Sequence, residues 1–217
     1  MTIHTIKGFS TVSTRTEGGP DALQGLFPIS AQPISFYSAG SEIYAQGEEA
    51  QNLYQVGFGC VRIYRLLADG RRQISAFHMS GEVFGFEAGG THHFFAEAVG
   101  ATGIRTARLS SGTETAHKIL PLALQGLVRA QEHLLVLGRQ NATERVAAFL
   151  LDMAERQGSL DQFELPMSRS DIADYLGLTI ETVSRVFSKL RQQRIIQLSG
   201  NRSVVISNWR ALRDMNE

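Results

Sequence analysis

The chain has 217 residues, which is long enough for two domains that each bury a hydrophobic core. Hydrophobic residues make up 43% of the sequence and charged residues 19%, a composition that is typical of a globular protein and argues against a largely disordered one. The 21 basic and 21 acidic residues cancel, so the total charge gives no sign of a nucleic-acid partner, and any such sign has to be local.

A single cysteine, Cys60, excludes an internal disulfide and any iron–sulfur or zinc site built only from cysteines of one chain. No run approaches the roughly 20 apolar residues that span a bilayer, and the N-terminal stretch lacks the apolar core of a signal peptide. We therefore expect a cytoplasmic protein that does not associate with membranes. The Gly, Ser and Thr content of residues 1–22 predicts a flexible N-terminal arm.

Residues 23–112 are predicted to form a β-domain, because short β-type runs alternate with glycines from Pro33 to about Leu109. This pattern is typical of an antiparallel barrel or jelly roll. Its clearest element is a hairpin within CVRIYRLLADGRRQISAF, where Asp69-Gly70 is suited to the positive φ angles of a tight turn. Cys60 begins this segment among apolar neighbours, which favours a small buried residue over a sensor thiol.

A long helix is predicted over residues 113–139, where glycines become rare and the hydrophobic period becomes helical. Pro121 either kinks this helix or lies in its first turn. One helix face carries a heptad-like seam formed by Leu120, Leu124, Leu127, Gln131 and Leu134. Two interpretations stay open with equal weight: the seam packs against the chain's own β-domain, or it forms a two-fold dimer with a second copy.

Residues 140–217 are predicted to form a winged helix-turn-helix. The segment ATERVAAFLLDMAERQG predicts an amphipathic helix. In the following MSRSDIADYLGLTIETVSRVFSKL, Ser168 and Asp171 form a capping box that begins a short helix, and Gly177 can end it in the left-handed conformation. Thr179 then caps a second helix that runs from Ile180 to about residue 193. Two β-rich runs, 194–198 and 202–206, follow as a hairpin wing.

The second helix of this pair has a polar and basic outer face. Val183, Val186, Phe187 and Leu190 mark its apolar side, which leaves Glu181, Ser184, Arg185 and Lys189 pointing outward. No acidic residue occurs between Thr182 and Arg213, although seven basic residues fall in or next to that interval. Arginine can bond O6 and N7 of guanine, and glutamate can accept from a cytosine amino group. The alternative is a protein–protein module whose basic face is only solvated.

These residues resemble the CRP/FNR family of bacterial transcription regulators, and its FixK branch in particular. The resemblance covers almost the whole chain and is most specific in LPMSRSDIADYLGLTIETVSRVFSKL, with E-x-x-S-R at Glu181, Ser184 and Arg185. It implies an α+β fold with a β-roll (a jelly roll like that of cyclic-nucleotide-binding domains), a dimerisation helix and a C-terminal winged helix-turn-helix. It also implies a homodimer that binds a palindrome with half-sites similar to TTGA and contacts RNA polymerase, in most members as an activator.

The resemblance assigns DNA contacts to individual residues. Arg185 would contact the half-site guanine and Glu181 the cytosine of the opposite strand, with Ser184 assisting and Ile180 packing on a thymine methyl group. Ser168 would cap its helix and bond a phosphate. The other DNA contacts that we expect come from Arg169, Thr179, Lys189 and Arg202.

Two departures from the family bear on regulation. Members that bind cyclic AMP use a Gly-Glu pair and a later Arg-Ser or Arg-Thr pair; in FGFEAGGTHHFFAEAVGAT, Glu87 is the candidate for the glutamate, but no arginine stands near Phe94. Members with an iron–sulfur cluster carry N-terminal cysteines, which are missing here. FixK-like proteins can carry a cysteine where this chain has Ser168, which cannot be oxidised in that way. We expect no cofactor; the alternative is an unidentified small effector in the β-roll.

His92 and His93 raise the hypothesis of a metal or haem site. We expect both in a strand, where neighbours point to opposite faces and Glu97, on the His93 face, is about 13 Å away, so that they would share no ion. A cupin-like enzyme fused to a DNA-binding tail is a further rival. The sequence has no glycine-flanked nucleophilic serine, Walker loop or H-E-x-x-H motif, and we expect no enzyme.

Overall fold

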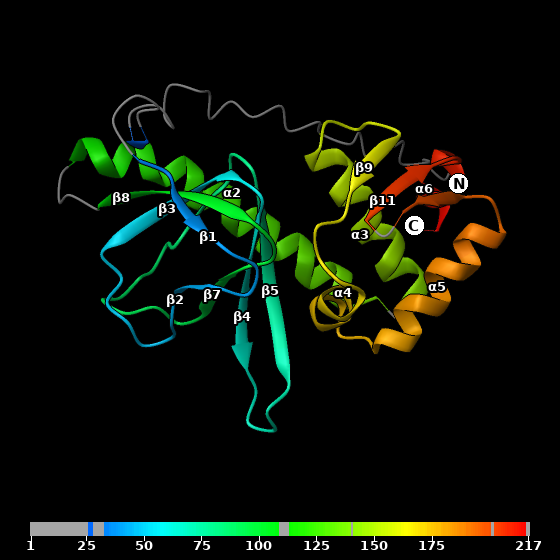
Figure 1. Ribbon diagram of the computed structural model, residues 1–217, viewed down its shortest axis with the longest axis horizontal. Coiled ribbons are helices and arrows are strands. Elements are labelled where there is room, and N and C mark those ends of the chain that lie inside the picture. Colours follow the sequence, from blue (N-terminus) through cyan, green and yellow to red (C-terminus); the bar gives the residue numbers. More distant parts are fainter. Residues whose placement is uncertain (1–25, 28–32, 109–112, 140, 201, 216–217) are drawn as a thin grey trace, which may run out of the picture.

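The computed structural model describes residues 26–27, 33–108, 113–139, 141–200 and 202–215 of the chain. Figure 1 shows a β-rich lobe and a helical lobe, with one long helix running from the first toward the second. The predicted fold class is confirmed. The predicted arm, residues 1–22, lies outside the described residues, and the predicted domain limits stay predictions.

Two four-stranded antiparallel sheets build the β-roll. The first has the order β1 (Ser35–Tyr37), β8 (Thr102–Arg108), β3 (Asn52–Phe58) and β6 (Val83–Phe84). The second has the order β2 (Glu42–Tyr44), β7 (Phe95–Ala98), β4 (Cys60–Leu66) and β5 (Arg72–Met79). Side chains from both sheets meet in one core, which includes Tyr44, Tyr54, Val61, Phe84 and Ile104.

The predicted hairpin is present, but its turn differs from the prediction. β4 and β5 pair from Cys60↔Met79 to Leu66↔Arg72, which leaves the five residues 67–71 as the loop. Gly70 has a φ of 82°, whereas Asp69 is not in the left-handed region. The Asp69 carboxylate instead accepts from the backbone N–H of Arg71. The expectation of a tight turn was therefore wrong, because this longer loop needs a left-handed conformation only at the glycine.

The long predicted helix is α2 (Thr113–Leu137), and Pro121 lies inside it, beyond the first turn. The four leucines of its seam are between 51% and 66% exposed, and Gln131 is exposed as well. The seam therefore does not pack against the β-roll of its own chain, and that interpretation was wrong. Another side of α2 faces the protein, where His133 is buried.

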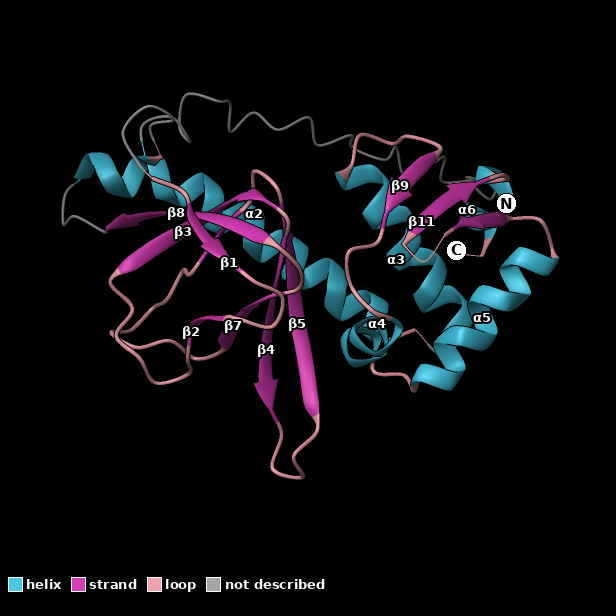
Figure 2. Ribbon diagram, viewed as in Figure 1, coloured by secondary structure: helices cyan, strands magenta, loops and turns pink. Residues whose placement is uncertain are grey.

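Four helices and a small sheet form the C-terminal lobe (Figure 2). The helices are α3 (Ala142–Arg156), α4 (Arg169–Leu176), α5 (Ile180–Gln192) and α6 (Trp209–Asp214). The strands pair antiparallel in the order β10 (Ile196–Ser199), β11 (Ser203–Ile206) and β9 (Gln162–Glu164). The core joins the buried faces of α3, α4 and α5, including Leu150, Ile172, Leu176, Val183 and Leu190. Within the described chain, every helix is too short or too polar to cross a bilayer.

Candidate nucleic-acid interface

The turn between α4 and α5 is built by local hydrogen bonds that the sequence predicts. The Ser168 hydroxyl accepts from the backbone N–H of Asp171 at 3.1 Å, and the Asp171 carboxylate accepts from the backbone N–H of Ser168 at 3.0 Å. Gly177 ends α4 with a φ of 62°. The Thr179 hydroxyl accepts from the backbone N–H of Thr182 at 3.3 Å and begins α5. The predicted capping box, left-handed glycine and N-cap are thus confirmed.

The apolar residues of α5 decide which of its faces points outward. Its apolar residues Val183, Val186, Phe187 and Leu190 are buried, as predicted. Glu181, Ser184, Arg185 and Lys189 are all exposed on the other side, and Ile180 is 44% exposed at the first turn. The polar and basic face is therefore available to a partner along the length of the helix.

The two charged groups near the start of α5 are suited to hydrogen bonding. A hydrogen bond from the backbone N–H of Glu181 itself lowers the pKa of its carboxyl group, and the Thr179 hydroxyl and the charge of Arg185 lower it further. Glu181 is therefore ionised and able to accept at neutral pH. Arg185 Nη2 donates to the Thr182 hydroxyl at 3.2 Å, which orients the guanidinium along the N-terminal half of the helix.

Eight of the nine predicted DNA-contacting residues are exposed, and Arg169 is the half-buried one. Its guanidinium carbon lies 3.3 Å from the centroid of the Phe187 ring, and burial lowers its pKa to about 10. Stacking on an aromatic ring occupies a flat face of the guanidinium and leaves its N–H edges free to donate. Arg169 thus also packs α4 against α5, a role that sequence reasoning missed. Arg202 is exposed just before β11.

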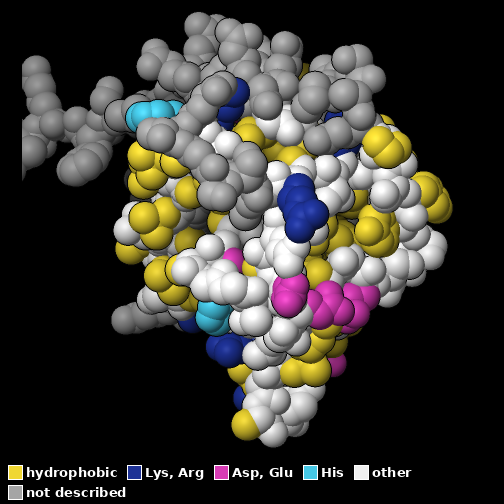
Figure 3. All heavy atoms as spheres, turned by 90° about the vertical axis from the view of Figure 1, so that its left-hand side faces the viewer, with side chains coloured by type: hydrophobic (Ala, Val, Ile, Leu, Met, Phe, Trp, Pro, Cys, Tyr) yellow, Lys and Arg dark blue, Asp and Glu magenta, His cyan; other side chains and the backbone are white. Residues whose placement is uncertain are grey.

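The β-roll side of the molecule has a different surface. Figure 3 views it from that side, and hydrophobic or uncharged groups cover most of the visible described surface. The basic run that begins at Arg185 belongs to the other lobe. The charge asymmetry expected from the sequence is therefore local to one stretch of the C-terminal lobe.

The histidine pair lies in the connection between β6 and β7 and not in a strand. There the backbone N–H of His92 donates to the Glu48 carbonyl oxygen, and the His92 carbonyl accepts from the N–H of Gly47. Both rings reach one carboxylate: His93 Nδ1 lies 2.7 Å and His92 Nδ1 3.4 Å from Glu87. The strand geometry that we expected was therefore wrong. No three His, Cys, Asp or Glu side chains within the described ranges are placed to hold a metal ion.

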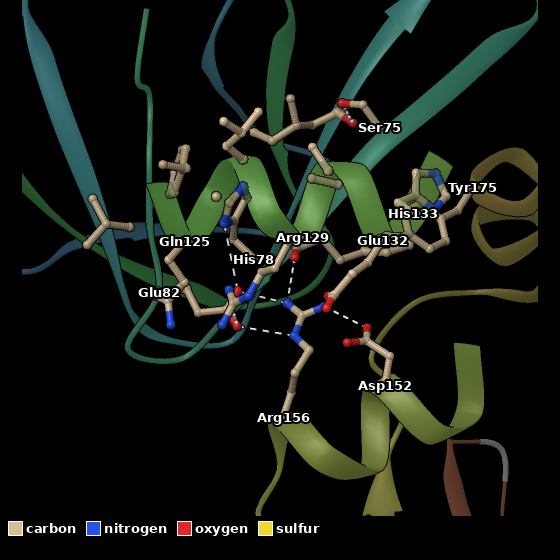
Figure 4. A pocket seen from close by; sticks show the side chains of 18 of the residues that line it. Ser75, His78, Glu82, Gln125, Arg129, Glu132, His133, Asp152, Arg156 and Tyr175 are labelled. Carbon is tan, nitrogen blue, oxygen red and sulfur yellow. Dashed lines mark hydrogen bonds and ion pairs between the residues drawn. The ribbon is translucent and has the colours of Figure 1, made fainter. Parts of the chain in front are cut away.

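Sequence reasoning also missed a cavity of about 720 Å³ between the β-roll, α2 and α3 (Figure 4). Glu82 lies at its wall, with Arg129 Nη1 at 2.9 Å and Arg156 Nη2 at 2.7 Å from its carboxylate. These arginines outweigh the effect of burial and lower the pKa of Glu82. His133 stacks on Tyr175 at 3.8 Å between ring centroids, and burial lowers its pKa to about 4. Neither ring nitrogen of His133 has a hydrogen-bond partner in the described structure.

Comparisons with known proteins match both lobes. A model of the Crp-like helix-turn-helix domain matches residues 144–215, and a model of the cyclic nucleotide-binding domain matches residues 34–111. The nitrogen fixation regulation protein FixK of Rhizobium meliloti is 55% identical over 182 residues, which are 84% of this chain and 86% of that protein. FixK of Azorhizobium caulinodans is 44% identical over 83% of this chain and 77% of its own length. The structure of FixK2 from Bradyrhizobium japonicum superposes with a TM-score of 0.81 at 44% identity, covering 86% of this chain and 98% of that one.

Proposed function

The chain belongs to the CRP/FNR family of transcription regulators, in its FixK-like branch, and from this premise we propose that it binds, as a homodimer, a palindrome of two TTGA-like half-sites. It is a DNA-binding regulator and not an enzyme. The observation that carries the proposal is the outer face of α5, where Glu181 and Arg185 are exposed one helical turn apart at the N-terminal end.

The proposed contacts are those that the family resemblance implies, and the exposure of that face is compatible with them. Arg185 bonds O6 and N7 of the half-site guanine, and Glu181 accepts from the cytosine amino group on the opposite strand. Ser184 assists them, and the half-exposed Ile180 packs on a thymine methyl group. The residues that bond the DNA backbone and set the register are Ser168, Arg169, Thr179, Lys189 and Arg202.

The exposed seam of α2 supports the homodimer. Leucines that are more than half exposed on the longest helix leave an apolar stripe in water, which is unusual for a monomer. Burying one of them against a second copy is worth about 2 kcal/mol. The proposed interface consists of Leu120, Leu124, Leu127, Gln131 and Leu134, and its two-fold symmetry would match that of a palindrome.

We propose that this regulator uses no cyclic nucleotide. A cyclic nucleotide presents an anionic phosphate, which a cationic side chain would have to bind. At the candidate position Glu87 is held by two histidines; burial raises its pKa, but hydrogen bonds from His93 and His92 outweigh that effect and keep the carboxyl pKa below its ordinary value. Glu87 therefore matches the family's glutamate, but the later arginine that would bind the phosphate has no counterpart in the sequence near Phe94. The β-roll instead contacts RNA polymerase, and the protein acts in the cytoplasm as an activator of transcription.

Binding-site selection from random double-stranded DNA tests this proposal. We expect the recovered sequences to contain two inverted TTGA-like half-sites at a fixed spacing. A pool with a single half-site would contradict the dimer, and a pool whose half-site lacks the guanine would contradict the role of Arg185.

A second candidate function rests on the cavity of Figure 4: a small effector binds there and gates DNA binding. The unpartnered ring nitrogens of His133 favour it, because a ligand with hydrogen-bonding groups would satisfy them. Thermal-shift screening of metabolites separates the two candidates. A compound that raises the melting temperature and changes DNA affinity supports gating, whereas stabilisation that His133→Phe leaves intact places the compound elsewhere.

A further inference from the structure

Two arginines of the β-roll hold the first turn of α4. Arg62 of β4 donates from Nη1 to Asp171 Oδ1 at 3.0 Å, and Arg72 of β5 donates from Nη2 to the same oxygen at 2.6 Å. Arg72 also bonds Asp174 Oδ2, from Nη2 at 2.8 Å and from Nε at 3.0 Å. We call these four residues the interlobe clamp. Glu97 of β7 pairs with the other end of the Arg62 guanidinium.

The clamp is largely shielded from water, unlike an ordinary surface ion pair. The side chain of Asp171 is 5% exposed, that of Arg62 15% and that of Arg72 23%. Partial burial strengthens the attraction between opposite charges, and removing one partner leaves the other buried and unpaired. Each carboxylate of the clamp therefore depends on the β-roll for its compensating charge.

One carboxylate joins the clamp to the start of α4. While Asp171 Oδ1 accepts from the two arginines, its Oδ2 accepts from the hydroxyl of Ser168 at 2.8 Å. A further hydrogen bond joins β5 to α4: Gln73 Nε2 donates to the Asp174 carbonyl oxygen at 2.7 Å. The outward face of α5 takes no part in these contacts and stays exposed. The β-roll thus contacts α4, the helix before α5, and leaves the outward face of α5 free to bind DNA.

From this arrangement we propose that Arg62 and Arg72 are positioning residues for DNA binding, which fix each helix-turn-helix relative to the β-roll and so set the separation of the two α5 helices. This inference rests on the proposed function, since it requires a dimer on a palindrome. The covalent connection between α2 and α3 consists of only four residues, 138–141. Arg156 of α3 already attaches this lobe to the β-roll through Glu82 and the Phe77 carbonyl oxygen. The clamp adds an attachment at α4, which restricts rotation of that helix relative to the β-roll.

The experiment compares Arg72→Met with Arg71→Met in the full-length protein. Arg71 is the matched control: it is the neighbouring arginine, but its side chain is 77% exposed and pairs with Asp69 inside the hairpin. Fluorescence anisotropy would measure affinity for three duplexes: the selected palindrome, the same palindrome with two base pairs added between its half-sites, and a single half-site. Circular dichroism before and after titration checks that each variant is folded.

We expect Arg72→Met to weaken binding to the selected palindrome by about 3- to 30-fold, to reduce the preference for its spacing, and to leave single half-site binding unchanged. Arg71→Met should match the parent protein on all three duplexes. An equal loss on the palindrome and the half-site would overturn the proposal, because the clamp would then only stabilise the helix-turn-helix. Retention of the full spacing preference would overturn it too.

Asp174→Asn provides an independent test, because Asp174 lies in the clamp but outside the capping box. If the clamp acts as one unit, Asp174→Asn should reduce the spacing preference, and adding it to Arg72→Met should weaken binding no further. Additive losses would count against the proposal. Failure of the proposed function looks different: the parent protein itself would then bind the palindrome no better than the single half-site.

Discussion

The helices α2 and α5 each expose one face to water, and the two faces carry different kinds of side chains. On α5 the exposed residues are polar or charged, whereas on α2 they are mainly leucines. A polar face is stable in water without a partner, so only the identity and spacing of Glu181 and Arg185 indicate what it binds. An apolar face is unfavourable in water, and its exposure alone indicates a partner. Similar exposure thus implies a DNA contact in one case and a protein contact in the other.

The largest expected effect comes from the apolar face. Leu127→Glu combined with Leu134→Glu places charges in the proposed seam, and light scattering should show monomers. Palindrome affinity should fall by about 10²- to 10⁴-fold, because two half-sites are no longer bound as one unit. Leu160→Glu is the control, since Leu160 is 61% exposed and lies outside α2; it should remain dimeric. A dimer of unchanged affinity in the double variant would place the seam elsewhere.

The polar face is tested by Arg185→Ala. We expect binding to the palindrome to weaken by about 1 to 3 kcal/mol per half-site and binding to a scrambled duplex to change little, because Arg185 bonds one particular guanine. Fluorescence anisotropy on both duplexes gives the comparison. Equal losses on the two would mean that Arg185 contacts the DNA backbone, and the base-reading role of this face would be wrong.

Arg202→Ala should have a smaller and different effect. Arg202 is exposed at the wing, outside α5, and we expect it to neutralise a phosphate. Its removal should weaken the palindrome and the scrambled duplex alike, and should reduce the slope of log affinity against log salt by about one unit for each phosphate that is no longer neutralised. A salt series on both duplexes measures this slope. An effect confined to the palindrome would assign a base contact to the wing.

The smallest expected effect is that of cyclic nucleotides. If α2 can form the dimer and α5 can bind DNA without an effector, titrations of the palindrome with and without cyclic AMP or cyclic GMP should coincide. A gain of tenfold or more, about 1.4 kcal/mol of coupling, would show that the β-roll binds the nucleotide without the arginine that the family uses for the phosphate. It would also mean that the α2 or α5 surface depends on a ligand.

The features that the sequence predicts best depend on residues close together in the chain, within about one helical turn. The capping box at Ser168, the left-handed Gly177 and the outward face of α5 depend on residues three or four positions apart, where local geometry dictates the outcome. The order of the lobes followed from the spacing of the glycines and the change of hydrophobic period, and the family resemblance agreed with it. Arg169 was expected only to contact DNA, because its ring contact with Phe187 forms only when α4 and α5 pack together.

Contacts between segments that are far apart in the sequence could not be predicted from it. Arg62 and Asp171 are separated by 109 positions in the chain, and nothing near either residue in the sequence marks the other as its partner. The same holds for β9, which pairs with β11 across a distance that no turn signal spans. His92 and His93 were expected in a strand, but they lie in the connection between β6 and β7, where the backbone of His92 pairs with residues 47 and 48, far away in the sequence.

The burial of Cys60 has a practical consequence. Its side chain lies in the protein interior at 1% exposure, and burial raises the pKa of the thiol to about 12, so almost no thiolate exists at neutral pH. Thiol reagents act on the thiolate, and this is the only cysteine of the chain. A cysteine introduced at the exposed Ser188 of α5 would therefore be the one reactive site per chain. A pair of spin labels attached there would report the distance between the two reading helices of a dimer, with no native cysteine to remove first.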